Sequence, residues 1–315
     1  MSRVLKIIAG LVLLAACGDR GEAVSQKSNI EPAKPAGKLV LVTGATGRQG
    51  GAVARALLEK GYRVRGTTRN PASERASKMA ALGVEMVKAD FDSVDSLKGA
   101  MKDAYGVFSM TSFWEHGYDA EVRHGKNTVD AAVQSGIQHY VYTSVANADQ
   151  DTGIPHFDSK YEVEKYIHES GLTYTVIRPV SFMENWEYHR ESILSGKLQL
   201  PFSVSTPLQE ISVRDIGRFV ALALDNPKDW AGKSLDIAGD ELTPRQLQQL
   251  FSRVTGSPVE FVQTPWDVHE KNEGEEMTIM DKWFEEVGYS ANINLVRSYL
   301  PGMLSLEDYL EQAGW

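Results

Sequence analysis

Short apolar runs alternate along residues 38–178 with longer segments that have helical periodicity. Apolar strands separated by helices are typical of a parallel sheet covered by helices on both faces. We therefore expect an α/β fold built on a doubly wound parallel sheet. The predicted strands are Lys38–Thr43, Tyr62–Thr68, Val84–Lys88, Gly106–Met110, Gln138–Ser144 and Tyr174–Arg178, and the predicted helices are Gly50–Lys60, Ser73–Leu82, Ser93–Lys102, Glu121–Ser135 and Ser159–Ser170.

Beyond Pro179 this alternation fails, and the pattern predicts only two more helices. One is Arg214–Asp225. The other begins at Thr243-Pro244, an N-cap residue followed by proline at the first helical position, and runs to about Val254. We expect residues 38–180 to form the sheet domain. Residues 181–315 should form a second, smaller α/β substrate domain, partly interleaved with the first, over the carboxyl ends of the strands.

The N-terminus has a pattern of its own. A basic start with Arg3 and Lys6 precedes the uncharged, mostly apolar run Ile7–Ala16. A membrane span needs about 20 residues, so this run suits a signal peptide instead. Its end, LAAC, resembles a bacterial lipobox, in which the cysteine is lipid-modified. We expect a lipoprotein signal peptide ending at Cys17, a flexible tether over residues 18–37, and a domain held on the extracytoplasmic face of the cell envelope by the lipid anchor alone.

Composition excludes several classes of protein. The chain has 315 residues, of which 42% are hydrophobic and 24% charged, which excludes collagen-like and disordered chains. A net charge of −9 without a basic block argues against a nucleic-acid partner. The single cysteine excludes an internal disulfide and a thiolate metal cluster, and the seven histidines lack metal-ligand spacing. We expect no metal site.

A glycine-rich loop connects the first predicted strand to the first predicted helix. Its spacing is G-x-x-G-x-x-G. Glycines at these places allow a tight turn and let the backbone approach a pyrophosphate at the positive end of the following helix. The loop therefore predicts a dinucleotide phosphate site, with these candidate residues: Gly44, Thr46, Gly47, Arg48, Gln49 and Gly50.

The end of the second predicted strand indicates which nucleotide is preferred. A site for NAD(H) would place Asp or Glu there, on the ribose hydroxyls. Here the strand ends at Arg69, and no acid follows until Glu74. An arginine can form charge-assisted bonds to a 2′-phosphate, and Arg48 in the loop could assist. We expect the cofactor to be NADP(H).

Several strings along residues 38–315 resemble the NmrA-like family of atypical short-chain dehydrogenase/reductases, which have a Rossmann NAD(P)-binding fold. They are VTGATGRQGGAVARALLEKG, TTRNP, ADFD, FSMTSFWE, YVYTS, HFDSKYEVEKY, TVIRPVSFMEN and VRDIGRF. The resemblance implies further cofactor contacts: Asp90 and Phe91 beside the adenine, Thr111 and Ser112 along the cofactor, and Phe182 and Asn185 near the nicotinamide. Ser144 matches the serine position of the superfamily, although a simple turn residue fits equally.

Many members of this superfamily use Tyr-x-x-x-Lys on one helix. Tyr161 and Lys165 have that spacing, but the fuller pattern Y-x-x-S-K-x-x-x-E matches residues 156–164 at all but the first position. The family lysine also lies about 18 residues before an Arg-Pro pair. Lys160 is 18 residues before Arg178, whereas Lys165 is 13. Five residues turn a helix by about 140°, so Lys160 should face the cofactor and Lys165 the solvent.

His156 therefore stands where the family tyrosine would be. Two mechanisms remain open: Lys160 alone holds the ribose and relays a proton through water, as in isoflavone-reductase-like relatives, or His156 donates the proton. His156 could also be a helix-start residue without chemistry. The first functional hypothesis is an NADPH-dependent reductase that transfers hydride to a small electrophile such as a quinone or an enal. The alternative is a non-catalytic NADP(H)-binding redox sensor of the NmrA type, with a regulatory protein partner.

Overall fold

The computed structural model describes residues 37–315. The predicted signal peptide, Cys17 and the predicted tether up to residue 36 lie outside the described residues. No helix in the described part is long and apolar enough to cross a membrane.

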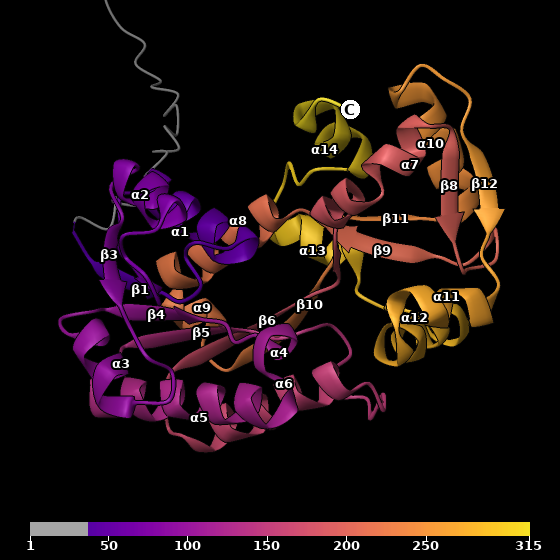
Figure 1. Ribbon diagram of the computed structural model, residues 1–315. Helices are drawn as coiled ribbons and strands as arrows, with labels where there is room; N and C mark the ends of the chain where they lie inside the picture. The colour runs from indigo at the N-terminus through magenta and orange to yellow at the C-terminus, as the bar shows by residue number, and fades with distance from the viewer. Residues whose placement is uncertain (1–36) are drawn as a thin grey trace, which may run out of the picture. The chain divides into compact units, whose positions relative to one another are not determined.

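A seven-stranded sheet forms the centre of the fold, and all its pairings are parallel (Figure 1). Its strand order is β10-β6-β5-β4-β1-β2-β3. The strands are β1 (Leu39–Val42), β2 (Arg63–Thr68), β3 (Glu85–Lys88), β4 (Gly106–Ser109), β5 (His139–Thr143), β6 (Tyr174–Pro179) and β10 (Lys233–Ile237). The order reverses between β1 and β4, which confirms the predicted doubly wound sheet.

Helices cover both faces of this sheet, as Figure 1 shows. Alternate residues of a strand point to opposite faces. Val40 and Val42 accordingly belong to the core under α1 (Arg48–Glu59), α2 (Glu74–Ala81) and α8 (Val213–Asp225). Leu41 belongs to the core on the other face, under α3 (Val94–Met101), α5 (Tyr118–Gln134) and α6 (Pro155–Glu169). Burial on both faces explains why these strands read as continuous apolar runs.

Side-chain caps fix several helix starts. The hydroxyls of Ser73 and Ser93 accept hydrogen bonds from backbone N–H groups in the first turns of α2 and α3. Thr243 caps α10 (Pro244–Val254), as predicted from the Thr-Pro pair, and also forms a capping box with Gln246. These starts were predictable because a cap is a local signal.

Two predicted helix starts were wrong. The helix predicted from Ser159 begins at Pro155, because proline is favoured at the first helical position. His156 therefore lies in the first turn of α6. The helix predicted from Glu121 begins at Tyr118, after Gly117 with φ +78°.

Most elements after β6 were missed, because they are short and lack a clear period. A three-stranded sheet has the order β11-β9-β7, and β8 pairs with β12. We use "smaller lobe" for residues 181–212, 240–290 and 304–315. Its elements are β7 (Ser181–Phe182), η1 (Met183–Tyr188), α7 (Arg190–Leu194), β8 (Lys197–Leu200), β9 (Leu208–Ile211), β11 (Asp240–Leu242), α10, β12 (Glu260–Gln263), α11 (Trp266–Glu273), α12 (Glu275–Glu286) and α14 (Leu306–Ala313).

Between these segments the chain returns to the main sheet. α8 packs on α1, and β10 pairs with β6. The short helices α9 (Pro227–Trp230) and α13 (Ile293–Tyr299) contribute Trp230 and Val296 to the core under α1 and α8. The predicted domain boundary at residue 180 stays a prediction.

Candidate functional site

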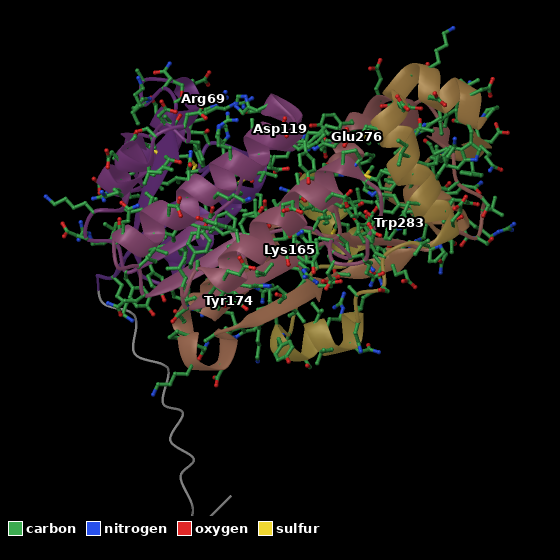
Figure 2. All side chains as sticks on the ribbon, turned by 90° about the horizontal axis from the view of Figure 1, so that it is seen from below. Arg69, Asp119, Lys165, Tyr174, Glu276 and Trp283 are labelled. Carbon is green, nitrogen blue, oxygen red and sulfur yellow. The ribbon has the colours of Figure 1, made fainter. Side chains whose placement is uncertain are left out.

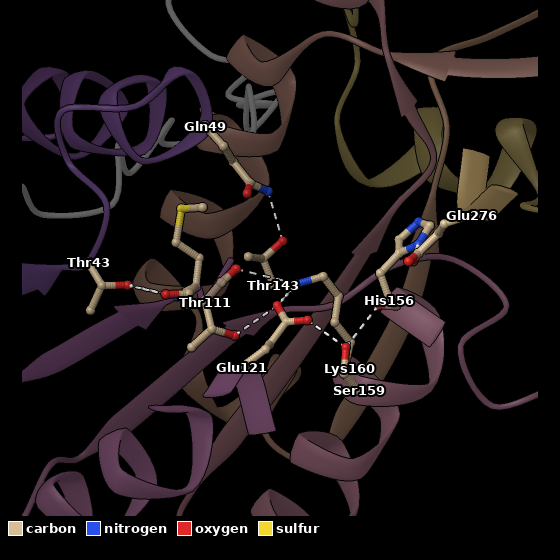
Figure 3. A network of polar contacts seen from close by, with 10 residues as sticks. Thr43, Gln49, Thr111, Glu121, Thr143, His156, Ser159, Lys160 and Glu276 are labelled. Atoms are coloured by element: carbon tan, nitrogen blue, oxygen red, sulfur yellow. Dashed lines mark hydrogen bonds and ion pairs between the residues drawn. The ribbon is translucent and has the colours of Figure 1, made fainter. Parts of the chain in front are cut away.

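The carboxyl ends of β1 and β4 lie side by side at the point where the strand order reverses. Open α/β sheets bind ligands at such a point. Thr43, directly after β1, ties the two ends together: its hydroxyl accepts a hydrogen bond from Met110 N at 2.7 Å and donates one to Met110 O at 3.1 Å (Figure 3). The loops that follow β1 and β4 therefore lie side by side at the carboxyl edge of the sheet.

The glycine-rich loop between β1 and α1 needs its glycines. Gly44 has φ +63°, which L-residues rarely adopt. A Cβ on Gly50 would lie 2.3 Å from the carbonyl oxygen of Gly44, so α1 passes too close to the loop for any side chain. Gly47 occupies the N-cap of α1, where no side chain caps the helix and no acid lies in the first turn. The backbone N–H groups there are thus available to an anion.

Gln49 anchors this loop to the next part of the site. Its amide donates to the Thr143 hydroxyl at the end of β5, at 2.8 Å, and both side chains are buried. Thr46 lies half-buried in the same loop. Side-chain hydrogen bonds therefore join the end of β1 to the end of β4, and the glycine-rich loop to the end of β5.

The two predicted phosphate-binding arginines have protein partners. Arg48 donates to the carbonyl oxygen of Glu184 at 3.2 Å, and its guanidinium lies 4.7 Å from the Tyr188 ring centre. Arg69 forms an ion pair of 3.2 Å with Glu115 on α4 (Phe113–His116). Both members of that pair are more than half exposed, and exposed pairs contribute little stability. Arg69 is thus open to a stronger anion, whereas Arg48 connects the loop to the smaller lobe.

Lys160 points inward from α6 and reaches the edge of the sheet. Its Nζ lies 2.7 Å from Glu121 Oε1 and 3.5 Å from the backbone oxygen of Thr111 (Figure 3). Lys165 on the same helix is exposed and pairs with Glu162. Lys160 and Lys165 therefore point to different sides of α6, as predicted from the rotation of the helix between them.

Glu121, the partner of Lys160, was not among the site residues predicted from the sequence. Its carboxylate is fully buried and also accepts hydrogen bonds from Thr111 Oγ1 at 3.1 Å and Ser159 Oγ at 2.5 Å. Burial by itself raises the pKa of a carboxyl group, but the Lys160 ammonium and these hydrogen bonds hold the pKa of Glu121 below its ordinary value. A signal existed: Glu121 shares the buried stripe of α5 with Gly125, and a carboxylate is rare on such a stripe.

His156 forms a second pair, which joins α6 to α12 of the smaller lobe. Its Nδ1 lies 2.8 Å from Glu276 Oε1. Because a carboxylate accepts hydrogen bonds and does not donate them, Nδ1 carries the proton. The imidazole ring lies 4.9 Å from the Trp114 ring and 5.8 Å from the Phe113 ring. Burial lowers the pKa of His156 below 6.5, aided by the Lys160 ammonium and opposed by Glu276.

Residues 36–310 match the model of the NmrA-like family. The chain belongs to the NmrA-like family. One member, the NmrA-like family domain-containing oxidoreductase malD of Malbranchea aurantiaca, is 32% identical over 254 residues, covering 71% of this chain and 75% of malD.

Solved structures show the same fold. Citrobacter sp. triphenylmethane reductase has a TM-score of 0.78 at 22% identity, covering 88% of this chain and 99% of that chain. NmrA, a negative transcriptional regulator solved in complex with NADP, has a TM-score of 0.71 at 22% identity, covering 88% of this chain and 98% of that chain.

Four buried hydroxyls in this NmrA-like protein have no hydrogen-bond partner among the described residues. They are Ser109 Oγ on β4, Tyr140 Oη and Tyr142 Oη on β5, and Ser144 Oγ, which directly follows β5 at the carboxyl edge of the sheet. Buried polar atoms are almost always paired, so Ser144 Oγ, at the edge where open α/β sheets bind ligands, is available to a polar ligand atom. In the part of the chain described here, no cluster of His, Cys, Asp and Glu could hold a metal ion.

The other predicted contact residues of this NmrA-like protein follow strands β3 and β4 or lie in the smaller lobe. Figure 2 places Arg69 and Glu276 on either side of Asp119, at the start of α5. The remaining positions are Asp90, exposed and accepting from the backbone of Asp92; Phe91, whose carbonyl accepts from Asn127; Ser112, at the N-cap of α4; Phe182, half-buried in β7; and Asn185, exposed in η1.

Proposed function

We propose that this chain is an NADPH-dependent reductase that transfers hydride to a small electrophile such as a quinone or an enal. The observation that carries the proposal is the loop from Gly44 to Gly50, which excludes a Cβ and presents the uncapped start of α1. Further support comes from Lys160, held at the same sheet edge, and from the naming of malD as an oxidoreductase. The Citrobacter reductase, which shares this fold, was solved with NADP(H).

The residues at the edge fit a dinucleotide. The glycine loop would receive the pyrophosphate, and Arg69 would bind a 2′-phosphate. Ser144 Oγ, which is buried and unpaired, would meet a polar group at the nicotinamide end, where Lys160 holds the ribose. The bound nucleotide supplies the hydride.

His156 is the group that can supply the accompanying proton. Glu276 fixes the proton on Nδ1, so donation from Nε2 requires the imidazolium form. Because burial lowers the pKa of His156 below 6.5, that form grows as the pH falls.

The first expected outcome concerns this proton. Turnover of NADPH should rise as the pH falls through the pKa of His156, below 6.5. Replacing His156 with asparagine should lower kcat about 100-fold and remove that rise, while NADPH affinity changes little. Steady-state kinetics between pH 5 and 8 measure both effects. His269→Asn is the matched control, because His269 also pairs with a buried carboxylate, Asp281, within the smaller lobe. An unchanged pH profile in the His156 variant would leave Lys160 and water as the proton source.

The second expected outcome concerns nucleotide preference. Arg69→Ala should weaken NADPH binding about 10-fold or more and leave NADH binding unchanged, because only NADPH carries the 2′-phosphate. Glu115→Gln should do the opposite and tighten NADPH binding, since it removes the carboxylate that competes for Arg69. Fluorescence titration with both nucleotides measures this. Equal losses for NADPH and NADH in Arg69→Ala would contradict a 2′-phosphate site at this residue.

The second candidate function is a non-catalytic NADP(H)-binding redox sensor with a regulatory protein partner. It is favoured by His156 at the family tyrosine position and by the fold shared with the regulator NmrA. The two functions differ in turnover. The reductase consumes NADPH with at least one member of a panel of quinones and enals. The sensor consumes none, and NADP+ and NADPH change its unfolding temperature by different amounts.

A further inference from the structure

Glu121 stands out among the buried charges because the predicted mechanism gives it no role. It lies in the first turn of α5, and its side chain is completely buried. A charge with no access to water is unfavourable unless it is paired and hydrogen-bonded. Glu121 meets that requirement with the Lys160 ammonium and the hydroxyls of Thr111 and Ser159.

These partners come from the parts of the chain that build the site. Thr111 belongs to the loop after β4, and Ser159 and Lys160 lie on α6. Oε1 accepts from Lys160 and Thr111, and Oε2 accepts from Ser159. One carboxylate thus joins two residues expected to contact the cofactor, Thr111 and Lys160, and fixes α6 against the sheet edge.

The ammonium of Lys160 depends on this carboxylate. It has three N–H donors. Within the described residues one goes to Glu121 at 2.7 Å and another to the backbone oxygen of Thr111 at the long distance of 3.5 Å. The third is left for a ligand. Without Glu121, only the long contact with the backbone oxygen of Thr111 would orient Lys160, and no carboxylate would contact its ammonium.

We propose that Glu121 is the positioning residue for Lys160: it compensates the ammonium charge and holds it toward the cofactor edge. The proposal rests on the proposed function, because it assigns Lys160 to the cofactor. The other titratable groups around the pair are His156 on α6 and Tyr142 on β5. Burial keeps Tyr142 neutral by raising its pKa well above 10.0 and lowers the pKa of His156, so Glu121 is the negative charge that faces Lys160.

The test compares Glu121→Gln, Glu121→Asp and the control Asp130→Asn. Asp130 also joins α5 to α6, through a hydrogen bond of 2.7 Å from Tyr166, but lies away from Lys160. We expect Glu121→Gln to raise the Kd for NADPH about 10-fold to 100-fold, and to lose affinity further between pH 7 and 9, where the wild type stays level. Glu121→Asp keeps the charge, so its Kd should rise less and its pH profile should stay level. Asp130→Asn should match the wild type.

A second readout does not depend on the cofactor. An amine is modified only in its unprotonated form, so the acetylation rate of Lys160, followed by peptide mass spectrometry, reports its charge. We expect Glu121→Gln to speed acetylation of Lys160 at pH 8 several-fold relative to exposed Lys165, whereas Glu121→Asp should not. Wild-type acetylation rates at Lys160 in a soluble, folded Glu121→Gln protein would overturn the proposal, as would wild-type NADPH affinity with a level pH profile. A wild type that binds no NADPH would instead overturn the proposed function, and the acetylation result would still decide the role of Glu121.

Discussion

Replacing Gly50 with alanine is expected to abolish NADPH binding and to lower the temperature of unfolding. The added Cβ would lie 2.3 Å from the carbonyl oxygen of Gly44 and 2.8 Å from that of Thr43. Both obstacles are backbone atoms, which cannot rotate aside as a flexible side chain can. Relief requires α1 to move away from the loop, which spoils the phosphate site and costs about 1–3 kcal/mol or more in stability.

Fluorescence titration with NADPH and a thermal unfolding curve measure the two effects of Gly50→Ala. Gly99→Ala is the matched control, because Gly99 lies inside helix α3 with nothing within 4 Å of an added Cβ. There alanine should leave binding unchanged and raise stability by up to about 1 kcal/mol. A Gly50→Ala protein that binds NADPH as tightly as the wild type would show that the loop does not receive the pyrophosphate.

Replacing Glu210 with glutamine is expected to stabilise the protein at alkaline pH. Glu210 lies on β9, and its oxygens accept hydrogen bonds from Trp186 Nε1 at 2.8 and 2.9 Å. Burial raises the pKa of Glu210 from 4.5 to about 8, and the nearby carboxylates of Asp240 and Glu184 add to the rise. The folded protein therefore favours the neutral acid.

The sign of the pH effect follows from that raised pKa. Stabilisation by Glu210 is complete below pH 4.5, where the folded and the unfolded chain are both protonated, and is lost as the pH rises through about 8. Glutamine stays neutral and can still accept from Trp186. At pH 9 the Glu210→Gln protein should thus be more stable than the wild type by a few kcal/mol, whereas at pH 5 the difference should be small.

Thermal or urea unfolding at pH 5, 7 and 9 measures this difference. Glu260→Gln serves as the control, because Glu260 is an exposed carboxylate on β12 of the same lobe. It should follow the wild type at every pH. A Glu210→Gln protein that loses stability with rising pH as steeply as the wild type would contradict the assignment of a buried neutral acid.

Features that the sequence predicted well depend on local chemistry. The first strand and the glycine-rich loop follow one another directly, and the loop's glycines are required by distances within one turn. The cap at Thr243 is equally local. The helical rotation between Lys160 and Lys165 needed only the geometry of one helix.

Features that the sequence did not predict depend on partners far along the chain. Glu276 meets His156 across 120 residues, and Glu121 meets Lys160 across 39. Strand β10 has only five residues and becomes a strand because β6 is there to pair with it. Such contacts form only when the sheet assembles, so the periodicity of the separate segments does not predict them.

The proposed reductase requires the edge of the sheet to bind a nicotinamide dinucleotide, with NADPH preferred. The most direct test is a fluorescence titration of the purified protein with NADPH and, in parallel, with NADH. The account predicts binding at micromolar NADPH and clearly weaker binding of NADH, with the preference lost in Arg69→Ala. Absence of binding to either nucleotide would contradict it and would make the glycine-rich loop a feature of the fold without a ligand.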